Sequence, residues 1–145
     1  MKLLHATTAL LSVLLACGAL LAATAPAASA HETVGGTESV KPLIKQALPD
    51  APGKQAMMVT VSYAPGQASE AHVHPGSVFA YVAEGEVVSQ LEGQPPVTYK
   101  TGDAWYEPPH TPHLVSRNAS QSKPARLIVW LVTNEGEALK RPYSR

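Results

Sequence analysis

Four of the six histidines lie between residues 72 and 113, and their spacing suits a metal site. His72 and His74 are two residues apart in a stretch expected to be extended, so both side chains should point to the same face. His113 follows a proline-rich turn and opens another expected strand, which could bring a third imidazole opposite them. This spacing therefore favours a metal site that uses three or four of these histidines.

Three further residues are candidates for proton transfer beside this site. Glu70 has the same strand parity as the first two histidines, although so near the start of the strand it could equally be solvated. Glu107 borders the proline-rich turn, and His110 lies inside that turn. We treat Glu70, Glu107 and His110 as candidate catalytic residues, with a solvent-facing turn residue as the alternative for His110.

The elements that would position these residues are short strands separated by glycine and proline. Several such runs at nearly even spacing predict an all-β sandwich or barrel. We predict an antiparallel barrel of roughly six to eight strands over residues 56–133, with Gly66, Gly85 and Gly102 at turns. Four aromatic residues within these strands are predicted to fill the core, with the barrel mouth as the alternative place for one or two of them: Tyr81, Trp105, Tyr106 and Trp130. The strand-like runs are 57–63, 77–83, 87–91, 97–99, 104–106, 114–115 and 126–132.

Two segments resemble the signature motifs of the cupin superfamily. The first contains Gly66, five residues, His72-Val73-His74 and a closing Gly85. The second contains Gly102, five residues, Pro108-Pro109-His110, two residues and His113, with Asn118 one residue late. The resemblance implies an all-β, cupin-type antiparallel barrel (jelly roll) in a single domain. It also implies one divalent transition metal ion (Fe, Mn, Ni, Cu or Zn) on His72, His74 and His113, whose nitrogens would converge within roughly 3–4 Å of one another. Many cupins pair through their sheets, so the resemblance is also compatible with a homodimer.

Two positions depart from the cupin pattern. Val78 stands where the first motif has a glutamate, so the resemblance leaves three histidines and an open coordination position. Three-histidine sites exist in the superfamily, and the missing carboxylate disfavours the four-ligand, oxalate-processing type. Glu70 and Glu107 are the candidates to replace that carboxylate. His110 replaces the glycine of the second motif, so a positive φ is expected at this residue.

Two functions agree with this site. The leading interpretation is an oxygenase, or else a lyase or isomerase, that acts on a small chelating organic compound. The alternative is a non-catalytic module that binds a small ligand or the metal itself. A proton donor or base beside the metal would favour catalysis, whereas a purely apolar funnel would favour binding.

Residues 1–30 have the pattern of a secretory signal peptide. A short basic start precedes an apolar run from Ala9 to Ala23, and Ala28-Ser29-Ala30 supplies the small residues of a cleavage site. The prediction is a periplasmic or secreted protein that begins at His31; the alternative is a lipoprotein anchored through Cys17. Residues 31–55 would then be an arm and covering segment, in which 40–48 fits a helix or a strand equally. Residues 134–145 would be a polar tail over the surface or disordered.

The composition of the chain limits the classes of partner that we expect. The chain has 11 Lys and Arg against 11 Asp and Glu, and it contains no basic block, so nucleic acid is not an expected partner. No apolar run after the leader is long enough to span a membrane. Cys17 is the single cysteine, so the mature chain would have neither a disulfide nor a thiolate ligand. A small-molecule substrate or ligand is the expected partner.

Overall fold

The computed structural model describes residues 37–144, and every regular element in this range is a β-strand. The predicted signal peptide, its cleavage site and Cys17 lie outside the described residues. Within them, no helix is long and apolar enough to cross a membrane. The strands are β1 (Ser39–Ala47), β2 (Lys54–Tyr63), β3 (Ala68–Ser69), β4 (His72–Val73), β5 (Ser77–Glu84), β6 (Glu86–Leu91), β7 (Val97–Lys100), β8 (Ala104–Glu107), β9 (His113–Asn118), β10 (Ala125–Asn134) and β11 (Arg141–Pro142).

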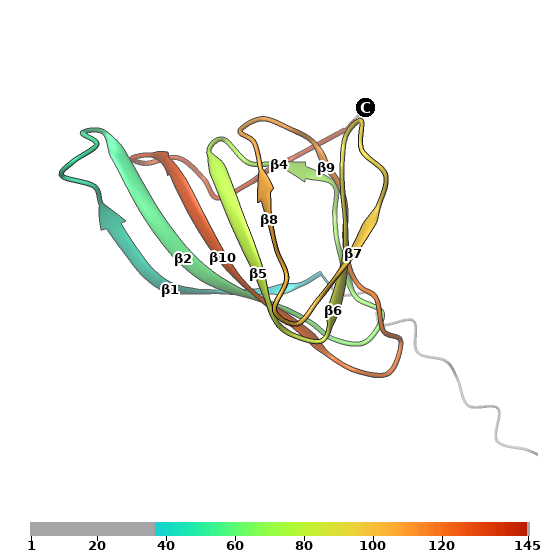
Figure 1. Cartoon of the computed structure of the whole chain (residues 1–145). Coiled ribbons are helices and arrows are strands. Elements are labelled where there is room, and N and C mark those ends of the chain that lie inside the picture. Colours follow the sequence, from blue (N-terminus) through green and yellow to red (C-terminus); the bar gives the residue numbers. More distant parts are fainter. Residues whose placement is uncertain (1–36, 145) are drawn as a thin grey trace, which may run out of the picture. The chain divides into compact units, whose positions relative to one another are not determined.

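The strands form two antiparallel sheets that pack face to face (Figure 1). One sheet has the order β1-β2-β10-β5-β8, and the other has the order β11-β4-β9-β6-β7, with β3 paired to β9. The prediction of an all-β antiparallel fold is therefore confirmed. Nine strands, β2 to β10, fall between residues 54 and 134, rather than six to eight, because β3 and β4 are separate two-residue strands.

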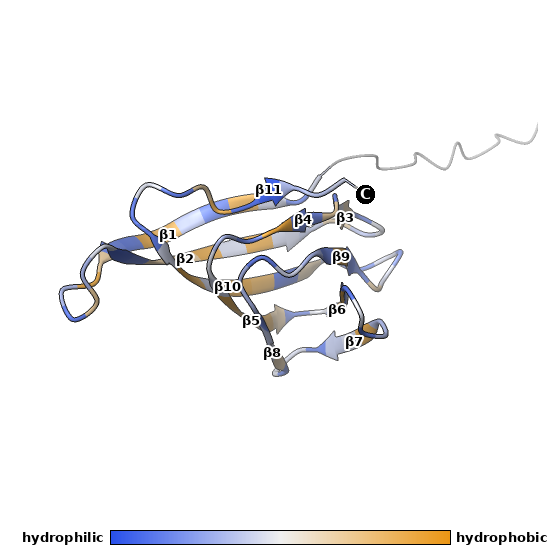
Figure 2. Cartoon of the chain, turned by 90° about the horizontal axis from the view of Figure 1, so that it is seen from above, coloured by the Kyte–Doolittle hydropathy of each residue, from blue (hydrophilic) through white to orange (hydrophobic). Residues whose placement is uncertain are grey.

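Alternation along the long strands determines which side chains fill the space between the sheets. In β10, Leu127, Val129 and Leu131 are buried, and the residues between them are not. This period of two in burial is the pattern of a strand with one buried face, and Figure 2 shows β10 as a largely hydrophobic strand. The core cluster consists of Val59, Tyr63, Val78, Ala80, Val82, Val87, Ala125, Leu127, Val129 and Leu131.

The prediction that four aromatic residues fill the core was wrong for three of them. Tyr81, Tyr106 and Trp130 are each about half exposed, because their parity places them on the outer face of the five-stranded sheet. Phe79 lies beside Trp130 and Tyr106 in the strand register, and its ring centroid is 5.1 Å from that of Tyr106. Trp105, one residue from Tyr106, points to the inner side.

Glycine allows the chain to turn where the sequence predicted turns. Gly66, Gly85 and Gly102 have φ values of 73°, 73° and 99°, and a Cβ at Gly85 would lie 2.5 Å from the carbonyl oxygen of Pro124. His110 has a φ of 60°, as expected for a residue at the position of a turn glycine. Among the described residues it is the only one other than glycine with a positive φ.

The segments before and after the predicted barrel each contribute a strand to the sheets, β1 and β11. Residues 39–47 form β1, which pairs along its length with β2, so the strand alternative holds for this segment. Near the other end, β11 pairs with β4, and the Tyr143 N–H donates to the carbonyl of Ala71 at 3.0 Å. Leu139 packs against the core cluster. The segment 139–143 thus lies across β4, which begins with the first predicted metal ligand, His72.

Candidate metal centre

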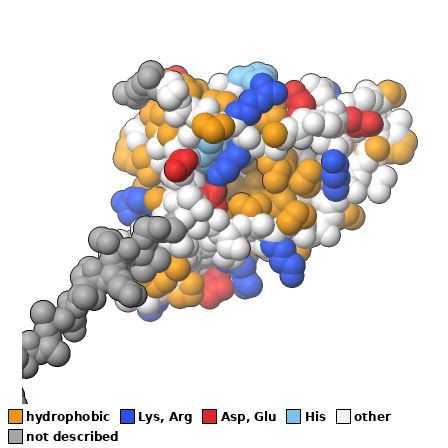
Figure 3. Space-filling model, turned by 180° about the vertical axis from the view of Figure 1, so that it is seen from behind, with side chains coloured by type: hydrophobic (Ala, Val, Ile, Leu, Met, Phe, Trp, Pro, Cys, Tyr) orange, Lys and Arg blue, Asp and Glu red, His pale blue; other side chains and the backbone are white. Residues whose placement is uncertain are grey.

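A cavity of about 250 Å³ opens between the two sheets. Valine and leucine are the commonest side chains in its walls, and three histidines and two glutamates also line it. Figure 3 shows a hollow floored by hydrophobic side chains, with histidine, acidic and basic side chains gathered at one side. The lining includes Val59, Val61, Val78, Leu127, Val129, Leu131, Trp105, Tyr63, His72, His74, His113, Glu107, Glu38, Leu139 and Lys140.

The structure brings the three predicted ligands together. His72 begins β4 and pairs directly with His113, which begins β9, while His74 follows β4 by one residue. Gly76 lets this segment press against β10, since any side chain there would collide with the carbonyl of Val132. One nitrogen from each histidine lies within 4.8 Å of the others, which is wider than the predicted 3–4 Å.

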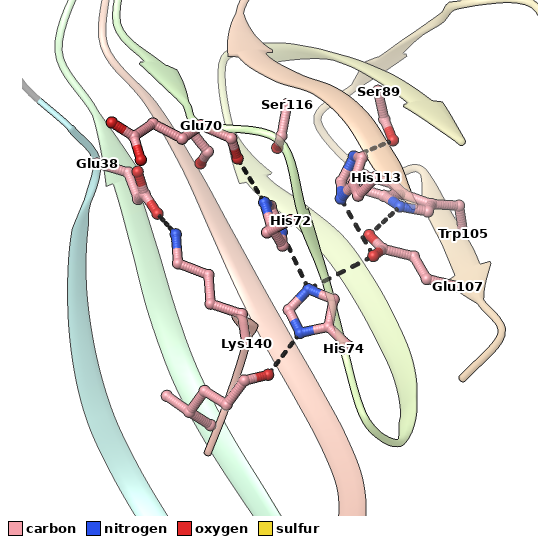
Figure 4. Close-up of polar contacts among 12 residues, drawn as sticks. Glu38, Glu70, His72, His74, Ser89, Trp105, Glu107, His113, Ser116 and Lys140 are labelled. Atoms are coloured by element: carbon pink, nitrogen blue, oxygen red, sulfur yellow. Dashed lines mark hydrogen bonds and ion pairs between the residues drawn. The ribbon is translucent and has the colours of Figure 1, made fainter. Parts of the chain in front are cut away.

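Two backbone carbonyls fix how the first two histidines are oriented (Figure 4). His72 Nδ1 lies 2.7 Å from the carbonyl oxygen of Glu70, and His74 Nδ1 lies 2.7 Å from that of Leu139. A carbonyl oxygen only accepts, so each Nδ1 must carry the proton and each Nε2 must carry a lone pair. The two Nε2 atoms are 3.1 Å apart. Two facing lone pairs at this distance repel unless a cation lies between them.

Burial keeps these imidazoles neutral. It lowers the pKa of His72 to about 4, against the opposite effect of the bond to the Glu70 carbonyl. Burial also lowers the pKa of His74, although the charge of Glu107 opposes the shift. A neutral imidazole whose Nδ1–H is held by a carbonyl and whose Nε2 is free is the usual form of a metal-binding histidine.

Glu107 brings a carboxylate to the same point. Its Oε1 accepts a 2.8 Å hydrogen bond from Trp105 Nε1, and its Oε2 lies 3.1 Å from His113 Nδ1 and 3.6 Å from His74 Nε2. The side chain is only 4% exposed. Burial would raise the pKa of Glu107, but His113, His74 and Trp105 together hold it below its usual value.

Unpartnered atoms in this cluster fit a metal ion. Among the described residues, Glu107 Oε2 and His113 Nδ1 are buried and have no well-directed hydrogen bond, while His113 Nε2 lies 2.8 Å from Ser89 Oγ. Three imidazoles and one carboxylate suit a divalent transition metal, which would satisfy these atoms and separate the two facing Nε2 lone pairs. Val78 is 1% exposed and forms part of the cavity wall, as its place in the motif predicted.

The other two candidate catalytic residues reach the site only through their backbones. Glu70 is an exposed residue, and its backbone carbonyl holds His72. His110 is also exposed, and its backbone N–H donates to the carbonyl oxygen of His74 at 2.8 Å. Sequence reasoning missed Ser89, Leu139 and the role of Trp105. Of these, only Trp105 carried a signal, because it has the same strand parity as Glu107.

Comparison with known proteins agrees with this architecture. The DMSP lyase DddQ from Ruegeria pomeroyi DSS-3 is 23% identical, with a TM-score of 0.59 over 73% of this chain and 51% of that one. The protein TT1209 from Thermus thermophilus is 32% identical, with a TM-score of 0.54 over 67% of this chain and 84% of that one. A recombinant oxalate oxidase in complex with glycolate is 19% identical, with a TM-score of 0.58 over 76% of this chain and 57% of that one. No curated protein matches the chain.

Two antiparallel sheets with a histidine cluster between them define a double-stranded β-helix protein with a site able to bind a metal. The family model described as "Cupin domain" matches residues 59–131, half of the chain, and the chain belongs to this family. It spans about half the length of the DMSP lyase. At 19–23% identity, the lyase and the oxidase share the fold with this chain.

Proposed function

We propose that this cupin is an exported, metal-dependent oxygenase of a small chelating organic compound. His72, His74, His113 and Glu107 would hold the metal, which when bound would supply open coordination positions for the substrate and dioxygen. The signal-peptide pattern of residues 1–30 supports the export part of this proposal.

The observation that carries the proposal is the position of the Glu107 carboxylate. Oε2 is buried, has no well-directed hydrogen bond among the described residues, and lies beside two histidine nitrogens at the end of an otherwise apolar cavity. A module that only holds an apolar ligand has no need of a buried charge, which is costly unless it is paired or binds a metal. A convergent carboxylate beside the metal ligands therefore favours an enzyme over a module that only binds an apolar ligand.

The chain's own residues contribute orientation and exclusion of water. The carbonyls of Glu70 and Leu139 hold two imidazoles, and Trp105 holds one oxygen of Glu107, so that Oε2 faces the cavity. The valine and leucine walls favour a substrate with an apolar body and keep water away from it.

A lyase is the second candidate, and the same carboxylate favours it. Because Glu107 Oε2 has no hydrogen bond among the described residues, it could accept a proton from a substrate carbon next to a chelating group. In an oxygenase, the same atom would remain among the metal ligands.

The oxygenase and lyase reactions can be distinguished experimentally, because only the oxygenase consumes dioxygen. Protein loaded with Fe²⁺, Mn²⁺, Ni²⁺, Cu²⁺ or Zn²⁺ is incubated with β-diketones and hydroxy acids, with and without oxygen, and oxygen consumption and products are measured. Turnover that consumes oxygen, is lost in Glu107→Gln and is retained in the exposed control Glu70→Gln supports the oxygenase. Anaerobic turnover supports the lyase, and stoichiometric binding without turnover supports the binding module.

A further inference from the structure

A second polar pair lies in the same cavity, on the opposite side of His72 from Glu107 in the view of Figure 4. Glu38 comes just before β1, and Lys140 comes from the segment that crosses β4. Lys140 Nζ donates to Glu38 Oε1. The two residues come from opposite ends of the described chain and meet only because both ends fold over the cavity.

Glu38 has a buried side chain, and only one of its two carboxylate oxygens takes part in the ion pair with Lys140. Its side chain is 5% exposed, and Oε2 is a buried atom with no hydrogen-bond partner among residues 37–144. The Ser69 hydroxyl and the backbone of Glu38 also lower the pKa of this carboxyl, and Ser69 Oγ lies 2.8 Å from the Tyr63 hydroxyl oxygen. Burial would raise the pKa of Glu38, but Lys140, the backbone of Glu38 and Ser69 together hold it below its usual value, so the group is a carboxylate.

An unpartnered carboxylate oxygen in a cavity wall is costly unless a donor reaches it. We propose that Glu38, held in place by Lys140, is a second recognition site, which accepts a hydrogen bond from a hydroxyl group of the ligand. The preferred ligand then has a metal-chelating group at one end, a short apolar body and a neutral hydroxyl at the other end. This inference rests on the proposed function, because it assumes that the substrate occupies the cavity.

Charge selects a hydroxyl over other polar groups. Lys140 already neutralises Glu38, so an ammonium group on the ligand would be repelled by Lys140, and a carboxylate would be repelled by Glu38. Lys140 is the only Lys or Arg side chain that lines the cavity among the described residues. A hydroxyl donates a hydrogen bond without adding charge.

The cavity also limits the length of the ligand. An apolar cavity of about 150 Å³ holds a benzene molecule, so a cavity of about 250 Å³ accommodates on the order of ten non-hydrogen atoms. The chelating group and the hydroxyl must therefore be separated by a short chain, which would lie along Val61, Leu127 and Val129.

Two hydroxamic acids of equal length test this inference by binding alone. ω-Hydroxyhexanohydroxamic acid and heptanohydroxamic acid have the same chelating group and differ by a terminal hydroxyl in place of a methyl group. Their dissociation constants for the full chain loaded with Zn²⁺ are measured by calorimetry. The hydroxylated compound should bind about tenfold more tightly, as expected for a hydrogen bond to a charged group.

Substitution then assigns the preference to Glu38. Glu38→Leu should abolish the preference while heptanohydroxamic acid still binds, and Glu38→Gln provides a second variant if the leucine variant does not fold. The matched control is Glu84→Leu, which removes an exposed carboxylate paired with Arg126 outside the cavity and should keep the preference.

The outcomes separate the two proposals. Equal affinity of both compounds for the unsubstituted protein, or a preference that persists in both Glu38 variants, overturns the hydroxyl site and leaves the proposed function standing. If neither compound binds, the cavity does not take chelating ligands, and the proposed function fails together with the inference.

Discussion

Val78 and Glu107 are direct partners in the register of β5 and β8. Val78 stands at the position where the first cupin motif has its glutamate, and Glu107 carries a carboxylate to the histidines from the neighbouring strand. Directly paired residues of an antiparallel sheet have Cβ atoms about 4.5–5.5 Å apart, so an acidic side chain at either position can reach the same point. The loss of the motif glutamate therefore does not remove the carboxylate from this site, and it gives no argument against a four-ligand centre.

This pairing predicts that a glutamate at position 78 can replace the carboxylate of Glu107. Glu107→Ala should weaken metal binding by roughly 10- to 100-fold, as the loss of a group that holds or orients a metal typically does. Val78→Glu in the Glu107→Ala background should restore most of the affinity. Val78→Glu alone should lower the thermal stability of the metal-free protein, because two buried carboxylates would then face each other.

Competition with a chromophoric chelator measures each affinity, and thermal unfolding of the metal-free proteins measures stability. The matched control is Glu70→Ala, which removes an exposed carboxylate. A double variant that binds metal no better than Glu107→Ala would show that the two positions do not serve the same point.

The strands and the histidines were predictable because their signals are local. Runs of apolar, β-branched and aromatic residues between turn residues identify β2, β5 and β10, and the two-residue spacing of His72 and His74 places both on one face. The convergence of Glu107 is not local, because its position relative to His74 depends on the register between β5 and β8. Parity alone could not say which face of β8 would be buried.

The contribution of the C-terminal segment could not be predicted for a different reason. Its polar sequence has no strand period, and Leu139 reaches His74 across 65 positions of sequence through its carbonyl, a group that every residue has. For the outward-facing aromatic residues, residue type alone led to the wrong prediction. Trp130 and Tyr106 are typical core residues by type, but their neighbours have the opposite parity and fill the core.

His74 and His110 should respond differently to substitution. His74→Ala removes a nitrogen from the cluster, so bound metal should fall from about one ion per chain to nearly none. His110→Ala should keep the metal, because the contact of His110 with the site is its backbone N–H, which alanine retains. Elemental analysis of the purified proteins measures both. Full occupancy in His74→Ala would place the metal elsewhere.

His110→Gly should stabilise the fold. A non-glycine residue in the left-handed region costs roughly 1–2 kcal/mol, and His110 has a φ of 60°. The gain in the free energy of unfolding should be about 1 kcal/mol, since glycine also has a more flexible unfolded state. Chemical denaturation measures it, with His110→Ala as the control, which should show no comparable gain. Equal stability of the glycine variant and the unsubstituted protein would contradict the strain at this turn.

The metal-free protein should lose stability in mild acid. The pKa of His72 is about 4 in the folded state and 6.5 in its ordinary state, so below pH 6.5 the unfolded chain binds a proton that the folded chain does not. Stability should therefore fall as the pH drops from 6.5 to about 4, by on the order of 3 kcal/mol from this residue. The lowered pKa of Glu107 acts in the same direction, since its protonation in acid removes a stabilising charge.

Denaturant titrations across this range measure the loss. In His72→Gln, which cannot titrate, the dependence on pH should be shallower by the contribution of one histidine. An unchanged slope in that variant would assign the acid sensitivity to other groups.

Removal of residues 139–145 should weaken metal binding without unfolding the two sheets. The truncated chain lacks the Leu139 carbonyl that accepts from His74 Nδ1, so the imidazole can rotate and change tautomer. We expect metal affinity to fall by roughly 10- to 100-fold, the usual effect of losing a group that orients a metal-binding histidine. Removal of residues 144 and 145 alone keeps the carbonyl and the contact of Tyr143 with Ala71, and should leave affinity unchanged.

A second comparison separates the carbonyl from the ion pair on the same segment. Lys140→Ala removes the bond to Glu38 but keeps the backbone of Leu139, so its metal affinity should stay near that of the full chain. Chelator competition measures affinity, and circular dichroism checks that each protein keeps its strands. If the truncated chain is folded and binds metal as tightly as the full chain, His74 does not need the Leu139 carbonyl. If Lys140→Ala loses as much affinity as the truncation, the ion pair rather than the carbonyl positions the imidazole.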